Sequence, residues 1–365
     1  MYIHQNKDWP NFKWDSDKLL PILGEVRNLQ GKIVGSMESL GFELREEANL
    51  KTLTLDVIKS TEIEGEKLDQ EQVRSSLARR LGMEIPDMVY SERDVDGVVE
   101  MMLDATQKFE LPLSQERLNN WHFSLFPTGR SGMYKVTVGK LRDDSTGPMQ
   151  VVSGAMGKEK IHYEAPSAGI LEEELNIFLD WTNSNVAMDS VLKAGIAHLW
   201  YLTLHPYEDG NGRMSRALTD MLLTRADGIK LRYYSMSSQI RIERKEYYEI
   251  LEQVQKGSIN ITDWLEWFLN CLKRAIESSY NTLENVIYKH SFWTKHSASI
   301  KNKRQKQLLN MLLDGFTGKL NTSKWAKIAK CSTDTALRDI QDLLRKEILV
   351  KEIGGGRNTS YKIRD

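Results

Sequence analysis

The segment His205–Arg216, with the sequence HPYEDGNGRMSR, joins two apolar stretches that both have helical spacing. Proline cannot continue a helix, because its ring clashes with the preceding turn and it has no N–H. Pro206 therefore ends the first helix directly after His205, and we expect the imidazole to face a cavity from that helix end. The segment predicts a helix–loop–helix unit whose loop carries the chemistry of the protein.

The loop also supplies groups that suit phosphates. Gly210 and Gly212 let backbone N–H groups approach a ligand closely, and they stand at the start of the second helix, where unpaired donors favour anions. Arg213 and Arg216 are three residues apart and share a helix face, so two guanidinium groups can grip a polyphosphate. Asp209 adds one hard oxygen for Mg²⁺. This set predicts phosphoryl or nucleotidyl transfer. The alternative is a polar interhelical loop with a capping histidine.

The segment resembles the signature of the Fic family (Fido superfamily), His-Pro-Phe-x-Asp/Glu-Gly-Asn-Gly-Arg-x-x-Arg, and departs from it only at Tyr207. The resemblance implies a protein adenylyltransferase that moves AMP from ATP to a Ser, Thr or Tyr hydroxyl of a protein, with self-modification. It also implies that His205 deprotonates the hydroxyl and that Asp209 holds Mg²⁺. The phosphate-binding residues that it implies are Gly210, Asn211, Gly212, Arg213, Met214, Ser215 and Arg216.

The stretch 149–163 has the pattern of a β-hairpin, and it is the only strand pairing that the sequence predicts before the C-terminal tail. Fic proteins carry a flap at this place, which pairs with an extended segment of the target. The resemblance implies that the tip of the hairpin borders the nucleotide, through Ser153, Gly154, Ala155 and Met156. The alternative is a hairpin with a purely structural role.

A tyrosine pair, Tyr247 and Tyr248, starts a predicted helix that runs to Gln255. In Fic proteins such a pair lines the adenine and ribose pocket, and an asparagine often stands where Gln255 stands here. Either amide could bind the adenine edge. The alternative is that both tyrosines belong to the core.

Upstream, the stretch Ser60–Gly65 (STEIEG) is similar to the inhibitory motif Ser/Thr-x-x-x-Glu-Gly/Asn of many Fic proteins. Its position implies the class with an N-terminal inhibitory helix. In that class Glu64 would pair with Arg216 and occupy the clamp meant for the γ-phosphate, with Ser60 hydrogen-bonded in the same site. The alternative is a solvated acidic helix end.

Helical spacing dominates the rest of the chain, so we predict a mainly α protein: a Fic-type helical bundle with a β-hairpin flap, plus a C-terminal winged helix-turn-helix. The expected regions are an N-terminal helical region with the inhibitory helix at 1–85, a Fic catalytic core at 86–288 and a winged-helix domain at 301–365. Residues 289–302 are polar and unperiodic and are predicted to be a linker. The last hairpin turns at 354–356.

The composition is that of a soluble globular protein, with 40% hydrophobic and 28% charged residues among 365. The sequence has no signal peptide and no apolar stretch of membrane-spanning length. Its two cysteines, Cys271 and Cys331, are too far apart in sequence for a metal motif. We therefore expect a cytoplasmic protein without a membrane partner.

From residue 301 onward, Lys and Arg outnumber Asp and Glu by 15 to 7, although the whole chain has a net charge of −1. A basic tail favours DNA as a partner of the winged helix. The alternatives are docking of a protein, a homodimer, or a basic face that rests on the acidic body. Two other functions also stay open: a de-AMPylase of the same target, and a DNA-binding regulator whose Fic domain only senses ATP.

Overall fold

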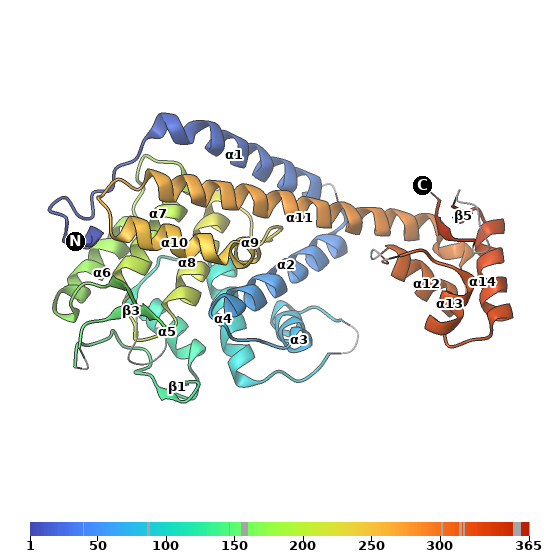
Figure 1. Cartoon of the computed structure of the whole chain (residues 1–365), viewed down its shortest axis with the longest axis horizontal. Coiled ribbons are helices and arrows are strands. Elements are labelled where there is room, and N and C mark those ends of the chain that lie inside the picture. The colour runs from blue at the N-terminus through green and yellow to red at the C-terminus, as the bar shows by residue number, and fades with distance from the viewer. Residues whose placement is uncertain are drawn as a thin grey trace. The chain divides into compact units, whose positions relative to one another are not determined.

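The computed structural model divides the chain into two compact units, Met1–Tyr280 and Asn281–Asp365, and both are mainly helical (Figure 1). The structure describes residues 1–38, 40–85, 88–145, 147–154, 160–300, 302–313, 316, 318–352 and 359–364. Among these residues, no helix is both long and apolar enough to cross a membrane.

The first unit contains the elements η1 (Ile3–Gln5), α1 (Ser16–Glu38), α2 (Phe42–Ile63), α3 (Gln70–Leu81), α4 (Arg93–Gln107), α5 (Gln115–Leu125), β1 (Arg130–Ser131), β2 (Tyr134–Lys135), β3 (Gln150–Ser153), β4 (Lys160–Glu164), α6 (Ala168–Asn183), α7 (Ser190–Leu204), α8 (Asn211–Asp227), α9 (Met236–Ile242), α10 (Arg244–Gln255) and the first part of α11 (Thr262–His296). The second unit contains the rest of α11, then η2 (Ser297–Ser299), α12 (Lys303–Leu313), α13 (Thr322–Ile328), α14 (Thr333–Arg345), β5 (Leu349–Lys351) and β6 (Tyr361–Ile363).

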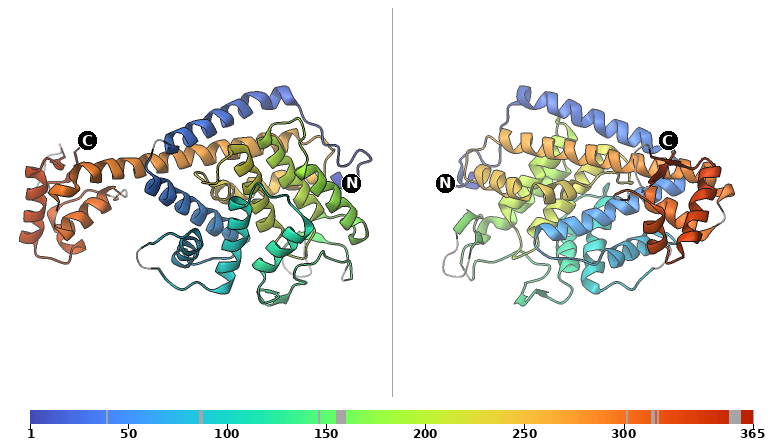
Figure 2. Two further views of the ribbon diagram at one scale, coloured as in Figure 1. Left: turned by 180° about the vertical axis from the view of Figure 1, so that it is seen from behind. Right: turned by 45° about the vertical axis from the view of Figure 1, so that its right-hand side comes forward.

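The first unit is built around α7 and α8, which pack closely against each other. Every residue of α7 from Ala194 to Leu204 is buried. A helix that is apolar on all faces needs protein on every side, and α7 therefore becomes the centre of the bundle. α6 packs on α7, α4 and α5 pack on α8, and α11 donates a hydrogen bond from Trp264 Nε1 to Gly195 O of α7 (2.8 Å). α1 and the first part of α11 run along one side of this unit in all views (Figures 1 and 2).

Helix α2 packs against α3, α8 and α9 and ends where the sequence predicts a stop. Glu64 is its C-cap residue, and Gly65 follows with a φ of +90°, a conformation that glycine adopts without steric cost. Asp69 then caps α3, because its side chain accepts a hydrogen bond from Gln72 N. The turn between the two helices is therefore held close to the start of α8.

The strands form three separate antiparallel pairs, β1–β2, β3–β4 and β5–β6. β3 and β4 form the predicted hairpin, with Val151 opposite Tyr163 and Ser153 opposite Lys160. The prediction that this is the only pairing before the tail is wrong, because β1 and β2 form another. Each of those strands has two residues, which is too short for an alternating pattern to show. The short helices α5 and α9 are also absent from the sequence-based prediction.

In the second unit, α12, α13 and α14 are followed by the β5–β6 pair. The predicted linker at 289–302 is wrong as far as His296, because α11 continues through it. Phe292 is 7% exposed and belongs to the apolar cluster of this unit, with Trp325 and Ile340. The linker prediction was wrong because this part of α11 is mostly polar, and its few buried aromatic side chains give the sequence no clear helical periodicity. The turn predicted at 354–356 lies outside the described residues.

Candidate active site

His205 stands at the end of α7 in a left-handed conformation, with φ 47° and ψ 59°. A non-glycine residue rarely adopts this conformation, and here the next residue is Pro206, which cannot extend the helix. The imidazole is partly exposed. Burial, and then the charge of Arg142, lowers the pKa of His205 to about 4. The ring is therefore neutral at pH 7 and can accept a proton.

Arg142 holds the backbone of this loop, and nothing in the sequence marks it for that role. Its Nε donates to His205 O (2.7 Å), its Nη2 donates to Pro166 O (2.5 Å), and its own backbone N donates to Pro206 O (3.0 Å). The side chain is only 3% exposed. Because a buried guanidinium in this position satisfies several carbonyl groups at once, it orients the histidine without touching the face that a ligand would meet.

Tyr207 and Asn211 close the loop from inside. Asn211 Nδ2 donates to Tyr207 O (2.7 Å), and Tyr207 N donates to Asn211 Oδ1 (3.1 Å). The ring of Tyr207 is fully buried and stacks on His122 at 4.4 Å between centroids. Its hydroxyl donates to Asn119 Oδ1 (2.7 Å). The tyrosine that replaces the phenylalanine of the signature is therefore accommodated by one extra hydrogen bond.

The first turn of α8 presents Arg213 and Arg216 on one face and the two residues between them on another. Met214 is fully buried, and its N–H donates to Gly210 O (3.0 Å). Ser215 is also buried, and its Oγ lies 3.2 Å from Nε2 of His198. The side chains of these two residues are turned away from the arginines, so the expected phosphate contacts can come only from the arginine side chains and the free amides of the loop.

Arg216 is joined to α2 by three hydrogen bonds although it is only 2% exposed. Its Nη2 donates to Glu64 Oε1 (2.7 Å) and to Ser60 O (2.9 Å), and its Nε donates to Ser60 Oγ (2.9 Å). Burial alone would lower the pKa of Arg216, but Glu64 and the nearby tyrosines raise it above its usual value. A Cβ atom on Gly212 would lie 2.1 Å from Glu64 Oε1, so only glycine leaves room for this carboxylate.

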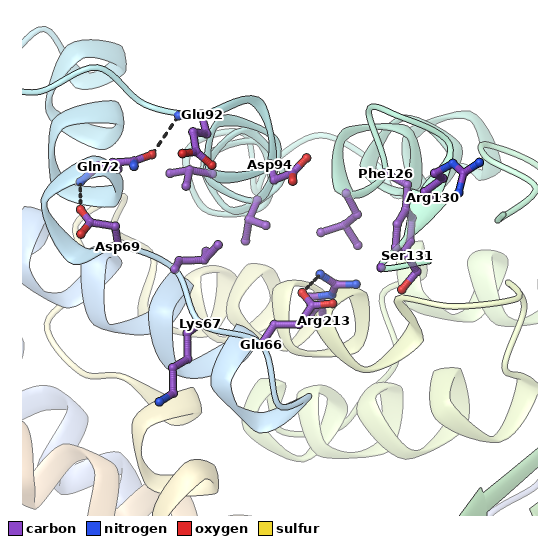
Figure 3. A pocket seen from close by; sticks show the side chains of 15 residues that line it. Glu66, Lys67, Asp69, Gln72, Glu92, Asp94, Phe126, Arg130, Ser131 and Arg213 are labelled. Atoms are coloured by element: carbon purple, nitrogen blue, oxygen red, sulfur yellow. Dashed lines mark hydrogen bonds and ion pairs between the residues drawn. The ribbon is translucent and has the colours of Figure 1, made fainter. Parts of the chain in front are cut away.

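Arg213 is paired with a second carboxylate, which the sequence analysis did not assign. Its Nη1 lies 2.9 Å from Oε2 of Glu66, and its guanidinium lies 5.1 Å from the ring centre of Phe126 (Figure 3). The pair borders a cavity of about 560 Å³ between the α2–α3 turn, α4 and the end of α5. A carboxylate two residues after Glu64 is a signal that the sequence contained, but which arginine it meets depends on the turn at Gly65.

Each arginine keeps one buried donor without a hydrogen-bond partner, Nε of Arg213 and Nη1 of Arg216. A ligand with several acceptor oxygens would satisfy both donors, as buried polar groups generally are in native proteins. Gly210, with a φ of +77°, is the N-cap of α8, where further backbone donors are free. A polyphosphate supplies acceptors of the required number and charge.

Asp209 is the carboxylate nearest to this helix start, and its Oδ1 accepts from Gly210 N (2.6 Å). Glu208, its neighbour, is turned outward and accepts from Thr137 N (2.9 Å). Within the part of the chain that the structure describes, no three His, Cys, Asp or Glu side chains converge on a metal position. Asp209 therefore fits Mg²⁺ only in a site where phosphates and water complete the coordination, which is the usual arrangement for this ion.

The flap and α10, which carries the proposed adenine residues, are in contact with each other. Ser153 is exposed at the end of β3, and Gly154 follows with a φ of +110°, whereas Ala155 and Met156 lie outside the described residues. The remaining residues of the expected set lie on α10 and differ in exposure. Tyr247 is 1% exposed and bonded to His198 Nε2 (2.8 Å), Gln255 is 6% exposed and bonded to Thr203, and Tyr248 is 36% exposed.

Of the two tyrosines, Tyr248 is the one that reaches Glu64. Its hydroxyl lies 3.4 Å from Glu64 Oε2, and Arg244 covers its ring at 5.0 Å. Tyr247 instead links α10 to α7 through His198, so its role as seen here is in the core.

Comparisons with known proteins agree with this geometry. Residues 112–223 match the Fic/DOC family, and residues 2–83 match a domain of unknown function, DUF4172. Protein adenylyltransferase fic-1 of Caenorhabditis briggsae is 29% identical over 178 residues, which cover 48% of this chain and 32% of that protein. Protein adenylyltransferase Fic of Aedes aegypti is 32% identical over 114 residues, 31% of this chain and 21% of that protein. The chain thus spans a third or less of these curated relatives.

Solved structures share the fold at low sequence identity. A Fic family protein from Desulfovibrio desulfuricans G20 has a TM-score of 0.53 and 19% identity, with 94% of this chain and 96% of that chain covered. Residues 134–508 of Fic-1 from C. elegans have a TM-score of 0.52 and 20% identity, with 74% of this chain and 74% of that chain covered. The bundle around α7 and α8 and its loop therefore define a protein of the Fic fold. The chain carries a Fic/DOC-family domain, which the family match locates at residues 112–223.

Tyr207→Phe restores the residue of the family signature and removes the hydrogen bond to Asn119. We expect a loss of about 0.5–1.5 kcal/mol in the free energy of unfolding, because the Asn119 carbonyl loses its buried partner. Urea denaturation followed by circular dichroism measures the change. Tyr90→Phe, at an 82% exposed tyrosine, is the matched control and should leave the midpoint unchanged. An equal effect of both variants would show that the Tyr207 hydroxyl contributes nothing specific.

Proposed function

We propose that this chain is a protein adenylyltransferase that transfers AMP from ATP to a Ser, Thr or Tyr hydroxyl of a protein, and also to itself. The observation that carries this proposal is the pair of unpaired buried donors on Arg213 and Arg216 beside the start of α8. The names of the relatives, protein adenylyltransferases at about 30% identity, support it.

In the proposed reaction, His205 takes the proton of the target hydroxyl, and the hydroxyl oxygen attacks the α-phosphorus of ATP while pyrophosphate leaves. The amides of Asn211 and Gly212 would receive the α-phosphate oxygens, because these groups stand at the positive end of α8, and the amide of Gly210 would join them on leaving Asp209 Oδ1. Arg213 and Arg216 would hold the β- and γ-phosphates. Such preorganised donors stabilise the charge that develops in the transition state.

Asp209 would hold Mg²⁺ together with the phosphates, and the ion would neutralise part of their charge when bound. The proposed base needs no metal for its own action. Its neutral state at pH 7 follows from burial and from Arg142, and the carbonyl contact of Arg142 keeps it in position.

The lowered pKa predicts an unusual pH profile. A general base must be unprotonated, so kcat/KM should fall only as the pH drops through about 4 and should stay flat between pH 5.5 and 7.5. An imidazole with an ordinary pKa near 6.5 would lose about nine-tenths of the rate at pH 5.5. Initial rates of AMP transfer across this range test the expectation, with circular dichroism to verify that the protein stays folded. A midpoint near 6.5 would contradict it.

We further propose that α2 inhibits this site. Glu64 occupies Arg216 with a carboxylate, Ser60 uses the Nε of the same guanidinium, and ATP must displace the carboxylate before its γ-phosphate can bind. Arg216 is buried in its contact with Glu64, so loss of the Glu64 carboxylate should change the activity strongly.

Glu64→Gly should raise self-labelling from α-labelled ATP and Mg²⁺ by at least about tenfold over wild type, because it frees Arg216 without adding a competing group. His205→Ala in the same background should remove most of the labelling. The measurement is autoradiography of the purified protein over time. Labelling that persists at an undiminished level without the His205 imidazole would refute the transferase mechanism, whereas equal labelling of wild type and Glu64→Gly would refute only the inhibition.

The second ion pair extends this inhibition to the other arginine. Glu66 holds Arg213 at 2.9 Å, and Gly65 between the two acids lets both carboxylates reach the first turn of α8. The Glu66 side chain is 48% exposed, so its contact should be weaker than that of Glu64. With both pairs intact, a carboxylate occupies part of each guanidinium, and a phosphate must compete with it.

Glu66→Gln should tighten ATP binding by about 2- to 10-fold, equivalent to roughly 0.4–1.4 kcal/mol, because Arg213 no longer has to give up a charged partner. Isothermal titration with ATP and Mg²⁺ in the His205→Ala background measures binding without turnover. Glu62→Gln is the control, since Glu62 lies in the same turn but pairs with Lys59 at 3.0 Å. A dissociation constant that does not differ between the two variants would rule out the second contact.

Removal of AMP from the same target is the alternative activity of this site, because Glu64 could also orient a water molecule. A pre-labelled target separates the two, since only the reverse activity releases AMP and requires Glu64. A site that only senses ATP would not need a neutral imidazole beside the clamp.

For the second unit, we propose a winged-helix domain whose partner is a protein or a second copy of the chain. On α14, the helix that would contact DNA, Asp342 accepts from Lys346 (2.6 Å) and lies 3.5 Å from Arg345. Asp339 of the same helix pairs with Arg304 at 2.9 Å. Because these pairs place carboxylates beside the basic side chains of α14, they disfavour the alternative of DNA phosphates as the partner of this helix.

A further inference from the structure

The flap contains a second group of side chains with catalytic character. Ser153 Oγ, at the end of β3, lies 2.5 Å from Nε2 of His162 on β4. Nδ1 of the same ring lies 2.5 Å from Oε2 of Glu252 on α10. This order, hydroxyl to Nε2 and Nδ1 to carboxylate, is the arrangement that activates a serine as a nucleophile. The proposed function gives no role to His162 or Glu252.

The surroundings of Glu252 set the direction of these hydrogen bonds. Its other oxygen, Oε1, receives Lys256 Nζ at 2.6 Å and lies 3.4 Å from Lys160 Nζ. Lys256, and then His162, hold the pKa of Glu252 at about 2, so the carboxylate is ionised and can only accept. His162 Nδ1 must then donate to it. With the proton on Nδ1, Nε2 is the ring nitrogen that faces Ser153 Oγ and can accept its hydroxyl hydrogen.

The group is tied to the proposed AMP-transfer site on two sides. Tyr163, next to His162, donates from its hydroxyl to Thr203 O (2.8 Å), two residues before His205. Ser153 lies two residues along β3 from the position opposite Tyr163, which is about 7 Å in a strand. On the other side, Glu252 stands one helical turn after Tyr248, whose hydroxyl lies 3.4 Å from Glu64. These contacts attach the hairpin and α10, which carry the group, to the elements that carry His205 and Glu64.

A purely structural role explains the arrangement less well. The His162–Glu252 and Lys160–Glu252 contacts already join the hairpin to α10. Ser153 is exposed and adds no packing, yet its hydroxyl is directed at the one ring nitrogen that can accept a proton. The group needs Ser153 as its third member only if the Ser153 hydroxyl reacts.

We propose that Ser153 is an acceptor of AMP from the chain's own active site, with His162 as its base and Glu252 as the residue that orients His162. This inference rests on the proposed transferase function. In the step, the bond between Ser153 Oγ and the α-phosphorus of ATP forms, the bond from that phosphorus to the bridging oxygen of pyrophosphate breaks, and the hydroxyl proton moves to Nε2. Glu252 stabilises the imidazolium that results. Self-modification would then place AMP on the flap itself.

The test maps AMP on the full chain. Glu64→Gly protein is incubated with ATP and Mg²⁺ and digested with trypsin, which releases residues 143–158 as one peptide. Because this peptide also contains Ser145 and Thr146, fragment ions assign the modified residue. We expect AMP on Ser153, none after Ser153→Ala, and retention after Ser153→Thr, which keeps the hydroxyl. His162→Gln should slow labelling of Ser153 about 100-fold, the usual contribution of a general base, and leave other labelled sites unchanged.

Two matched variants control for damage to the flap and the helix. Ser167→Ala removes an exposed serine three residues after β4 that makes no capping bond, and Glu249→Gln removes an exposed acid of α10. Neither should change labelling of Ser153, whereas Glu252→Gln should reduce it. AMP that appears only on other residues, or on Ser153 at an unchanged rate without His162, overturns this inference and leaves the transferase intact. A complete absence of AMP in Glu64→Gly protein overturns the transferase as well.

Discussion

The buried contact between Glu64 and Arg216 is the interaction on which the arrangement of the site depends. Arg216 is 2% exposed, and a guanidinium at such a position requires an anionic partner, because an uncompensated buried charge costs several kcal/mol. In this structure α2 supplies the anion, and it thereby joins the N-terminal helices to α8. In the proposed function, a triphosphate replaces that carboxylate. Under that proposal, the same need for a counter-charge holds the end of α2 against α8 and makes this contact sensitive to ATP.

The other residues of the site hold the backbone of the loop in place and leave Arg216 accessible to a ligand. Arg142 binds the carbonyl groups around His205 from the buried side, and Asn211 closes the loop on Tyr207. Since these contacts use backbone acceptors inside the protein, the amides at the start of α8 are left free for a ligand. The flap adds a further fixed point, because Tyr163 attaches β4 to the end of α7. In the proposed function, a loop held in this way needs little rearrangement when phosphates bind, apart from the displacement of Glu64, and this is the condition for electrostatic preorganisation.

Sequence patterns predicted the parts of this protein that depend on local physics. Pro206 ends α7, the glycines start α8, and Arg213 and Arg216 share a face because of helical spacing. Sequence patterns gave wrong predictions where contacts between residues distant in sequence decide the structure. Residues 289–296 continue α11 because Phe292 packs into a cluster formed mostly by residues more than 15 positions away, and β1–β2 is too short to leave a pattern. Arg142 and Glu66 are ordinary surface-type residues in sequence, and only their neighbours in space make them parts of the site.

By itself, the sequence determined the chemical inventory: a histidine at a helix end, glycines before a helix, two arginines on one face and an acidic motif upstream. These features follow from residue types and spacings of a few positions, which act through local conformation. Only the tertiary structure decided that Glu66 meets Arg213 beside the expected pair of Glu64 and Arg216, which residues of 213–216 turn toward the site, and that a serine, a histidine and a glutamate meet on the flap. Those pairings join segments up to 152 residues apart, and no local rule relates such segments before the chain has packed.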